Sequence, residues 1–239
     1  MGDIWKLDDT DTPLGKDRSE NEVIEGRSPS ESQTPIILSF VVDWANLVTL
    51  LGLSGGVLAI HFALVQNYPA AMIALLWAVL CDWYDGLAAR ATAGRSESFR
   101  SIGAQMDSLV DLVTSAVAPA ILLLSVGGFS AWLYPGALAI IMAGVLRLSY
   151  FNVFGVDKNG TYAGITIDNS PIAIAAIFLL ESFLDHNVFV AILYTAILVL
   201  AFLHVAPIRT GKLGPIWNYI MTGYVVLLTG GYSFILWTR

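Results

Sequence analysis

Long apolar stretches alternate with short polar connectors from residue 36 to the end of the chain. Each stretch approaches the roughly 20 residues that an α-helix needs to cross the hydrocarbon core of a bilayer. We expect helices over about 44–65, 69–91, 103–126, 131–153, 166–184, 187–207 and 216–237. The pattern predicts an all-α integral membrane protein, a bundle of six to seven transmembrane helices. The weakest crossing is 166–184, because Asp168 and Glu181 fall within it.

The composition supports this fold class and divides the chain in two. Of the 239 residues, 56% are hydrophobic and 13% are charged, which is typical of a protein whose solvent is lipid. Residues 1–35 differ, because they carry nine acidic and four basic residues and are too polar to form a core. We expect a disordered acidic cytoplasmic tail over 1–35 and a membrane domain over 36–239. The apolar run 36–42 is too short to span and predicts an interfacial helix.

The charge distribution predicts both the partners and the orientation. The net charge is −7 and there is no long basic run, so we do not expect a nucleic-acid partner. Basic residues near helix ends are retained on the cytoplasmic side. Seven crossings with the amino terminus inside leave only Arg239 outside and place the following on the cytoplasmic side: Arg90, Arg95, Arg100, Lys158, Arg209 and Lys212. We therefore predict a multi-pass protein of the inner, cytoplasmic membrane.

Four aspartates form the main candidate site. Asp82 and Asp85 lie three positions apart near the cytoplasmic end of the second predicted helix, and Asp107 and Asp111 lie four apart near the start of the third. Both spacings place the pair on one helix face. The two helices are consecutive and antiparallel, so the pairs can converge at one membrane depth. Four like charges there require a cation, and carboxylate oxygens favour magnesium, manganese or calcium. Two ions could clamp the attacking and leaving oxygens of a phosphoryl transfer.

Small and basic residues beside the aspartates fit phosphate chemistry. Gly86 and Gly103 would clear space for a ligand, since glycine otherwise destabilises a helix. Ala89 has a small side chain and leaves the same helix face open. Arg90 offers a guanidinium group to a phosphate at the membrane surface.

Two alternatives to an enzyme site remain open at the level of sequence. The acids could be interfacial groups that Arg90, Arg95 and Arg100 neutralise. The aspartates could also belong to a divalent-cation channel or transporter, although such a pathway would distribute polar residues through the full bilayer depth. The outer halves of the second and third helices are apolar, which disfavours a channel.

These residues form a long motif that resembles the signature of the CDP-alcohol phosphatidyltransferases. It reads Asp82-x-x-Asp85-Gly86-x-x-Ala89-Arg90, followed by Gly103-x-x-x-Asp107-x-x-x-Asp111. One departure is the connector Ala91–Ile102, which has twelve residues where the family usually has eight, and we expect the extra residues to be absorbed at the surface.

The resemblance implies roles for the residues of the motif. Asp82, Asp85 and Asp107 would be metal ligands, and Asp111 would be both a ligand and the catalytic general base. The cofactor would be Mg²⁺ or Mn²⁺, with two ions per site, and the protein would be a homodimer. The donor nucleotide and phosphates would contact these residues: Gly86, Ala89, Arg90, Gly103 and Ser108.

Within the family, the stretch from Gly103 to Ala120 and the run Arg147–Val153 are most similar to the phosphatidylserine synthase branch. That branch transfers the phosphatidyl group of CDP-diacylglycerol to the hydroxyl of L-serine and releases CMP. Tyr150 replaces an arginine of the branch, and Tyr162–Thr166 replaces a Gly-Leu-Pro turn. These departures weaken serine as the acceptor more than they weaken the reaction class. Inositol, inositol phosphate, glycerol phosphate and choline are the alternative acceptors.

Five polar residues are candidates for the acceptor or the lipid phosphate. Arg147 is a charge within a membrane helix and needs a partner, which is either an acceptor carboxylate, a lipid phosphate or an aspartate of the chain. Tyr150 and Asn152 lie near it in sequence. Asn46 and Thr49 open the first helix, where a helix-packing role is the alternative.

Overall fold

The computed structural model describes residues 36–92, 94–158, 160–211 and 215–238. The predicted tail, 1–35, lies outside the described residues, so its disorder stays a prediction. The elements, in chain order, are η1 (Ile37–Val42), α1 (Trp44–Leu64), α2 (Tyr68–Ala91), α3 (Glu97–Leu112), η2 (Val113–Val117), α4 (Ala118–Val126), η3 (Ala131–Leu133), α5 (Tyr134–Phe154), β1 (Thr161–Ala163), α6 (Asn169–Phe178), η4 (Glu181–Phe183), α7 (His186–Val205), β2 (Arg209–Gly211) and α8 (Pro215–Thr238).

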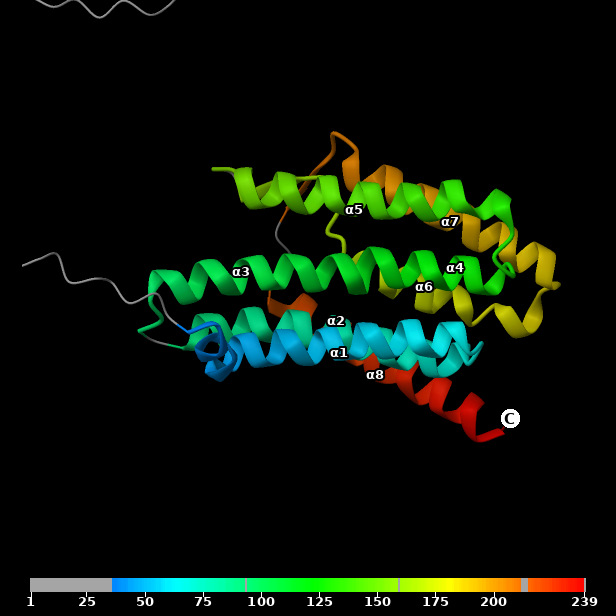
Figure 1. Ribbon diagram of the computed structural model, residues 1–239. Helices are drawn as coiled ribbons and strands as arrows, with labels where there is room; N and C mark the ends of the chain where they lie inside the picture. The colour runs from blue at the N-terminus through cyan, green and yellow to red at the C-terminus, as the bar shows by residue number, and fades with distance from the viewer. Residues whose placement is uncertain (1–35, 93, 159, 212–214, 239) are drawn as a thin grey trace, which may run out of the picture. The chain divides into compact units, whose positions relative to one another are not determined.

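Six helical segments of the described chain are long and apolar enough to cross a membrane. They are Trp44–Leu64, Tyr68–Ala91, Glu97–Val126, Ala131–Phe154, His186–Val205 and Tyr219–Thr238. Figure 1 shows these segments as a bundle of long helices, with α1 packed beside α2 and α5 beside α7. The predicted all-α membrane bundle is confirmed.

The helix expected over 166–184 is wrong in its length. α6 spans only Asn169–Phe178, and a separate short turn, η4, follows it. Gly164, with a φ of +73°, turns the chain before α6, and Pro171 lies in the first turn of the helix, where proline is favoured. In Figure 1, α5 and α7 run in the same direction, so α6 and the segment before it carry the chain back between them.

The third crossing is the centre of the bundle and carries two of the aspartates. Its most apolar window is 72% buried within the protein, more than that of any other crossing of the described chain. α3 and α4 form one rod that is interrupted by η2, a π-helical turn. Pro119 cannot donate a backbone hydrogen bond and its ring would crowd the preceding turn, so a π-turn there accommodates it. Asp111 lies near the end of α3, just before this π-helical turn, and Pro119 lies just after it.

The long connector of the signature is largely helical. α3 begins at Glu97, six residues earlier than expected, and the Ser96 hydroxyl accepts a hydrogen bond from Phe99 N at 3.4 Å as its amino-terminal cap. The extra residues therefore lengthen α3, and only a short turn separates it from α2.

Two elements outside the crossings position the loops around the site. η1 is a short 3-10 helix over the run for which the sequence predicts an interfacial helix, and its place at the membrane interface stays a prediction. Asp43 after it caps α1 by accepting from Ala45 N at 2.9 Å. β1 and β2 pair as a small antiparallel ribbon, with Tyr162 opposite Thr210. This ribbon, which the sequence did not predict, joins the connector after α5 to the connector after α7.

Candidate active site

Three of the four aspartates lie together. Asp82 comes from α2, and Asp107 and Asp111 come from successive turns of α3. One carboxylate oxygen from each residue lies within 4.8 Å of the other two. The spacing of four residues places Asp107 and Asp111 on one face of α3, and the antiparallel packing of α2 brings Asp82 to that face. We call these three residues the aspartate cluster.

Asp85 is oriented differently. It is buried, with 6% of its surface exposed, and its Oδ2 accepts a hydrogen bond from Thr49 Oγ1 of α1. It is not one of the three residues whose oxygens lie within reach of one another. Asp85 and Asp107 nevertheless line the same cavity. A hydroxyl of α1 thus fixes the fourth aspartate at the side of the cluster that faces this cavity.

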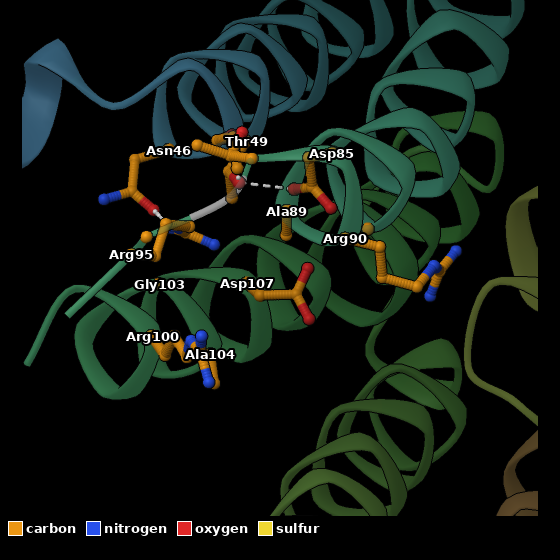
Figure 2. Close-up of a pocket in the computed structure, with 14 residues that line it drawn as sticks. Asn46, Thr49, Asp85, Ala89, Arg90, Arg95, Arg100, Gly103, Ala104 and Asp107 are labelled. Atoms are coloured by element: carbon orange, nitrogen blue, oxygen red, sulfur yellow. Dashed lines mark hydrogen bonds between the residues drawn. The ribbon is translucent and has the colours of Figure 1, made fainter. Parts of the chain in front are cut away.

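The larger cavity of the site has a volume of about 590 Å³ and lies between α1, α2 and α3 (Figure 2). Its lining combines two aspartates, three arginines and several small residues: Ala45, Asn46, Thr49, Asp85, Gly86, Ala89, Arg90, Thr92, Gly94, Arg95, Arg100, Gly103, Ala104 and Asp107. Four of the five residues predicted to contact the donor line it, namely Gly86, Ala89, Arg90 and Gly103. A cavity that combines guanidinium groups with small residues suits an anionic ligand with several phosphates.

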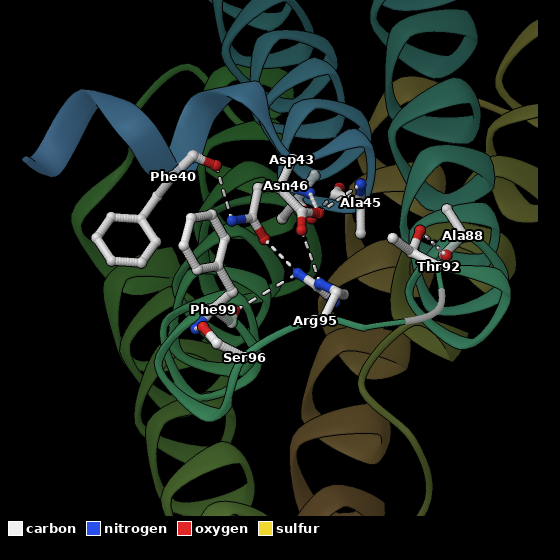
Figure 3. A network of polar contacts seen from close by, with 10 residues as sticks. Phe40, Asp43, Ala45, Asn46, Ala88, Thr92, Arg95, Ser96 and Phe99 are labelled. Atoms are coloured by element: carbon white, nitrogen blue, oxygen red, sulfur yellow. Dashed lines mark hydrogen bonds and ion pairs between the residues drawn. The ribbon is translucent and has the colours of Figure 1, made fainter. Parts of the chain in front are cut away.

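One wall of the larger cavity is held by a buried polar network (Figure 3). Arg95 Nε donates to Asp43 Oδ2 at 2.8 Å, and Arg95 Nη2 donates to Asn46 Oδ1 at 3.1 Å. The Asn46 side chain in turn donates to Phe40 O at 2.8 Å. A Cβ on Gly103 would lie 2.8 Å from Asn46 Oδ1 and 3.1 Å from an Arg95 guanidinium nitrogen, so a larger residue here would have to displace the network. The network fixes the start of α1 against the start of α3.

A smaller cavity of about 220 Å³ lies on the other side of the cluster. It is lined by Asp111, Arg147, Leu148, Phe151, Val156, Tyr162, Thr166, Ile167 and Asp168. Arg147 is only 6% exposed, and its Nε donates to Ile165 O at 3.1 Å. Its guanidinium carbon lies 5.2 Å from the centre of the Phe151 ring and 5.4 Å from that of Tyr162. Carbonyl and ring contacts thus hold this buried cation, which forms no ion pair with a carboxylate among the residues that the structure describes.

The aspartate cluster separates the two cavities. Asp107 lines the larger cavity and Asp111 lines the smaller one. A ligand in either cavity therefore meets a carboxylate of the same cluster, so ligands in the two cavities can reach one reaction centre.

The cluster fits a divalent cation. It offers carboxylate oxygens, which magnesium and manganese prefer, and it brings three carboxyl groups together with no basic side chain paired to them among the described residues. Within the described ranges, none of the four aspartates forms an ion pair with an arginine, and Arg95 pairs with Asp43 instead. The observed pairs therefore argue against the alternative in which Arg90, Arg95 and Arg100 neutralise the acids.

Not all predicted site residues line these cavities. Ser108 Oγ donates to Asn152 Oδ1 at 3.0 Å, so two residues assigned to different substrates join α3 to α5. Tyr150 packs against the Phe154 ring with centroids 4.5 Å apart. Asn46 and Thr49 line the larger cavity, whereas Arg147 lines the smaller one. The roles of these six predicted site residues stay predictions.

The structure adds residues that the sequence analysis did not place in a site. Arg95 and Arg100 line the larger cavity, and Tyr162, Thr166 and Asp168 line the smaller one. One signal was available for Asp168, because an acid within an apolar segment is a functional candidate. The sequence analysis interpreted Arg95 and Arg100 as markers of orientation and, in one alternative, as groups that neutralise the acids.

Comparison with known proteins decides the family. The model of the CDP-alcohol phosphatidyltransferase family matches residues 42–203, which contain α1 to most of α7 and every residue of the aspartate cluster. The chain belongs to the CDP-alcohol phosphatidyltransferase family. The membership agrees with the resemblance drawn from the motif.

Individual relatives within the CDP-alcohol phosphatidyltransferases are similar over parts of their length. The archaetidylserine synthase of Methanothermobacter thermautotrophicus is 38% identical over 146 residues, which are 60% of this chain and 60% of the relative. The CDP-diacylglycerol–serine O-phosphatidyltransferase of Bacillus subtilis is 34% identical over 124 residues, 51% of this chain and 67% of the relative. That of Mycobacterium bovis is 36% identical over 114 residues, 47% of this chain and 38% of the relative.

Proposed function

We propose that this protein is a CDP-diacylglycerol-dependent phosphatidyltransferase of phospholipid biosynthesis, which transfers the phosphatidyl group to the hydroxyl of L-serine and releases CMP. The observation that carries the proposal is the aspartate cluster of Asp82, Asp107 and Asp111 between two cavities. A transfer needs a donor and an acceptor at one centre, and this arrangement provides a separate space for each.

The larger cavity suits the donor. Its volume of about 590 Å³ falls in the range of about 300–1,000 Å³ that is usual for small-molecule sites. Arg95 and Arg100 supply positive charge for a pyrophosphate. A Cβ on Gly86 would meet only the Arg90 guanidinium, at 3.9 Å, so packing does not demand glycine there. The open space beside Gly86 supports the approach of a ligand to the α2 backbone.

The smaller cavity suits a small acceptor. Its volume of about 220 Å³ is less than half that of the larger cavity. Arg147 can bind the carboxylate of an amino acid, which supports serine over inositol, glycerol or choline acceptors. The names of the relatives also share serine, while they differ in the lipid, archaetidyl in one and diacylglycerol in the others.

The chemistry assigned to the chain is a displacement at phosphorus. The serine hydroxyl oxygen forms the new bond to phosphorus, and the phosphorus–oxygen bond to CMP breaks. Asp111, which lines the acceptor cavity, takes the hydroxyl proton as general base. Mg²⁺ or Mn²⁺ held by the aspartates would supply neutralisation of the phosphate charge. The side chains of Arg147 and the donor-cavity arginines orient the two substrates.

The location of the site follows from the same substrates. CMP is water-soluble and the lipid chains are not, so the reaction belongs at a membrane surface. The positions of the basic residues support the cytoplasmic side of the inner membrane. A homodimer remains an expectation from the family resemblance.

The test is the release of CMP by the purified protein. We expect release from CDP-diacylglycerol with serine, and much slower release with inositol, inositol phosphate, glycerol phosphate or choline. A parallel series with a CDP-linked ether lipid would determine the lipid preference. CMP release with another alcohol, and not with serine, would show that this alcohol is the acceptor. No release with any alcohol and either donor would contradict the proposed function.

A further inference from the structure

The smaller cavity holds one fixed cation and one fixed anion that do not neutralise each other. Arg147 and Asp168 both line it, yet they form no ion pair within the part of the chain that the structure describes. Arg147 instead binds Ile165 O and lies over two aromatic rings. Both charges are therefore available to a ligand that carries one charge of each sign.

Asp168 is held in place by a contact outside the cluster. Its Oδ2 accepts a hydrogen bond from Trp83 Nε1 of α2 at 3.2 Å. It precedes α6, after the turn that Gly164 makes possible. It does not belong to the three carboxylates whose oxygens lie within 4.8 Å of one another. These contacts place Asp168 at the wall of the acceptor cavity, beside the aspartate cluster but outside its set of three carboxylates.

We infer that Asp168 is a specificity-determining residue that binds the ammonium group of the acceptor. The inference rests on the proposed function and extends it. Serine carries its hydroxyl, ammonium and carboxylate on two neighbouring carbons. With the hydroxyl at Asp111 and the carboxylate at Arg147, the third cavity charge, Asp168, is complementary to the ammonium. Three attachment points in one small cavity select an amino acid over a plain alcohol.

The alternative acceptors lack this complementarity. Inositol phosphate and glycerol phosphate are anions without an ammonium group, so Asp168 would repel them. Choline has a cationic group but no carboxylate, so Arg147 would be left without its partner. Inositol carries no charge and would leave both Arg147 and Asp168 without a partner, so the charged side chains of the cavity disfavour all four alternatives.

The test uses acceptors that each lack one group of serine. 3-Hydroxypropionate lacks the ammonium, and ethanolamine lacks the carboxylate. Asp168→Asn keeps the size of the side chain and an oxygen for Trp83, but removes the charge. We expect kcat/KM for serine to fall about 10- to 100-fold, the range for a lost hydrogen bond to a charged group. The rate with 3-hydroxypropionate should stay within about twofold, so the preference for serine over it should collapse.

Controls separate this role from a structural or metal-binding one. Asp168→Asn should leave the KM for the CDP-linked donor and the affinity for Mn²⁺ unchanged, and Asp168→Glu should recover part of the serine preference. Asp185→Asn, an exposed acid before α7, is the matched control and should change nothing. A loss that is equal for both acceptors, or a weakened Mn²⁺ affinity, would overturn the assignment of Asp168.

The wild-type protein distinguishes this inference from the proposed function. If the wild type uses serine and the variant keeps the wild-type preference for serine over 3-hydroxypropionate, the assignment of Asp168 fails and the proposed function stands. If the wild type releases CMP with neither compound, both fail.

Discussion

The Arg95 guanidinium lies 2.8 Å from the Asp43 carboxylate, and the two side chains are each only 7% exposed. The pair joins residues 52 positions apart, one in the connector before α3 and the other at the cap of α1. Asp43 uses its other oxygen for the cap, so one carboxylate both starts α1 and holds Arg95 at the wall of the larger cavity. One wall of the larger cavity and the start of the first crossing are therefore held together by the same carboxylate.

Breaking this buried pair should affect both folding and donor binding. We expect Arg95→Gln to lower the free energy of unfolding by about 3 kcal/mol, since it leaves a buried carboxylate without its partner. The KM for the CDP-linked donor should rise, because Arg95 lines its cavity. Thermal unfolding in detergent and the donor dependence of CMP release measure the two effects.

Two comparisons sharpen the Arg95 prediction. Arg209→Gln breaks the exposed pair with Asp157, in which the arginine is 73% exposed, and should cost less than about 1 kcal/mol. The double variant Asp43→Asn/Arg95→Gln should recover stability, because Asn also caps a helix, but should not recover the donor KM. Equal stability losses in Arg95→Gln and Arg209→Gln would contradict the importance of burial.

Gly86 should be required by the ligand and not by packing. Gly86→Ala should fold with unchanged or slightly higher stability, since alanine favours a helix by up to about 1 kcal/mol. Its kcat/KM for the donor should fall at least about tenfold. Gly223→Ala in α8, where a Cβ meets no neighbour within 4 Å, is the matched control and should keep full activity. Activity of Gly86→Ala at the wild-type level would remove Gly86 from the donor site.

The Tyr162 ring should matter more than its hydroxyl. Burial raises the pKa of Tyr162 above its ordinary value, so the phenol stays protonated well beyond neutral pH. Tyr162→Phe keeps the surface that faces Arg147 and should retain serine transfer at pH 7 to 9. Tyr162→Ala should raise the KM for serine about 5- to 30-fold, as expected for the loss of a cation–π contact. A defect of the same size in Tyr162→Phe would show that the hydroxyl binds the acceptor.

The sequence predicted the aspartate cluster because the positions of these residues follow from short spacings along the chain. Spacings of three and four residues determine helix faces, and consecutive antiparallel helices must bring those faces to one depth. The contact between Asp85 and Thr49 was not predictable, because it depends on how α1 packs beside α2. The partner of Arg95 was hidden for the same reason, since nothing near residue 95 indicates Asp43.

The helix predicted over 166–184 was longer than α6 because the prediction followed the average hydrophobicity of the segment and not the turn signals within it. Gly164 and Pro171 already indicated a turn and a helix start, but the apolar residues from Ile172 onward suggested a full crossing. The shorter helix leaves residues 155–168 as a connector that forms β1 and part of the smaller cavity. Tyr162, Thr166 and Asp168, which line the smaller cavity from the segment before α6, were therefore harder to predict than Arg147 and Asp111.

Asp111 should be required for turnover and dispensable for nucleotide binding. Asp111→Asn removes the proton acceptor at the boundary of the acceptor cavity. Loss of a general base lowers rates by about 10²- to 10⁴-fold, so we expect CMP release to fall near background while binding of CMP survives. Turnover close to the wild-type rate in Asp111→Asn would exclude Asp111 as the base.

The central claim is that Asp82, Asp107 and Asp111 share a divalent cation between the donor and acceptor cavities. Anomalous diffraction from crystals of the full chain grown with Mn²⁺ tests it most directly. The account predicts a manganese peak in direct contact with carboxylates of Asp82, Asp107 and Asp111, and its loss in Asp107→Asn. A protein that releases CMP in the same Mn²⁺ buffer but binds no manganese at these carboxylates would contradict the account.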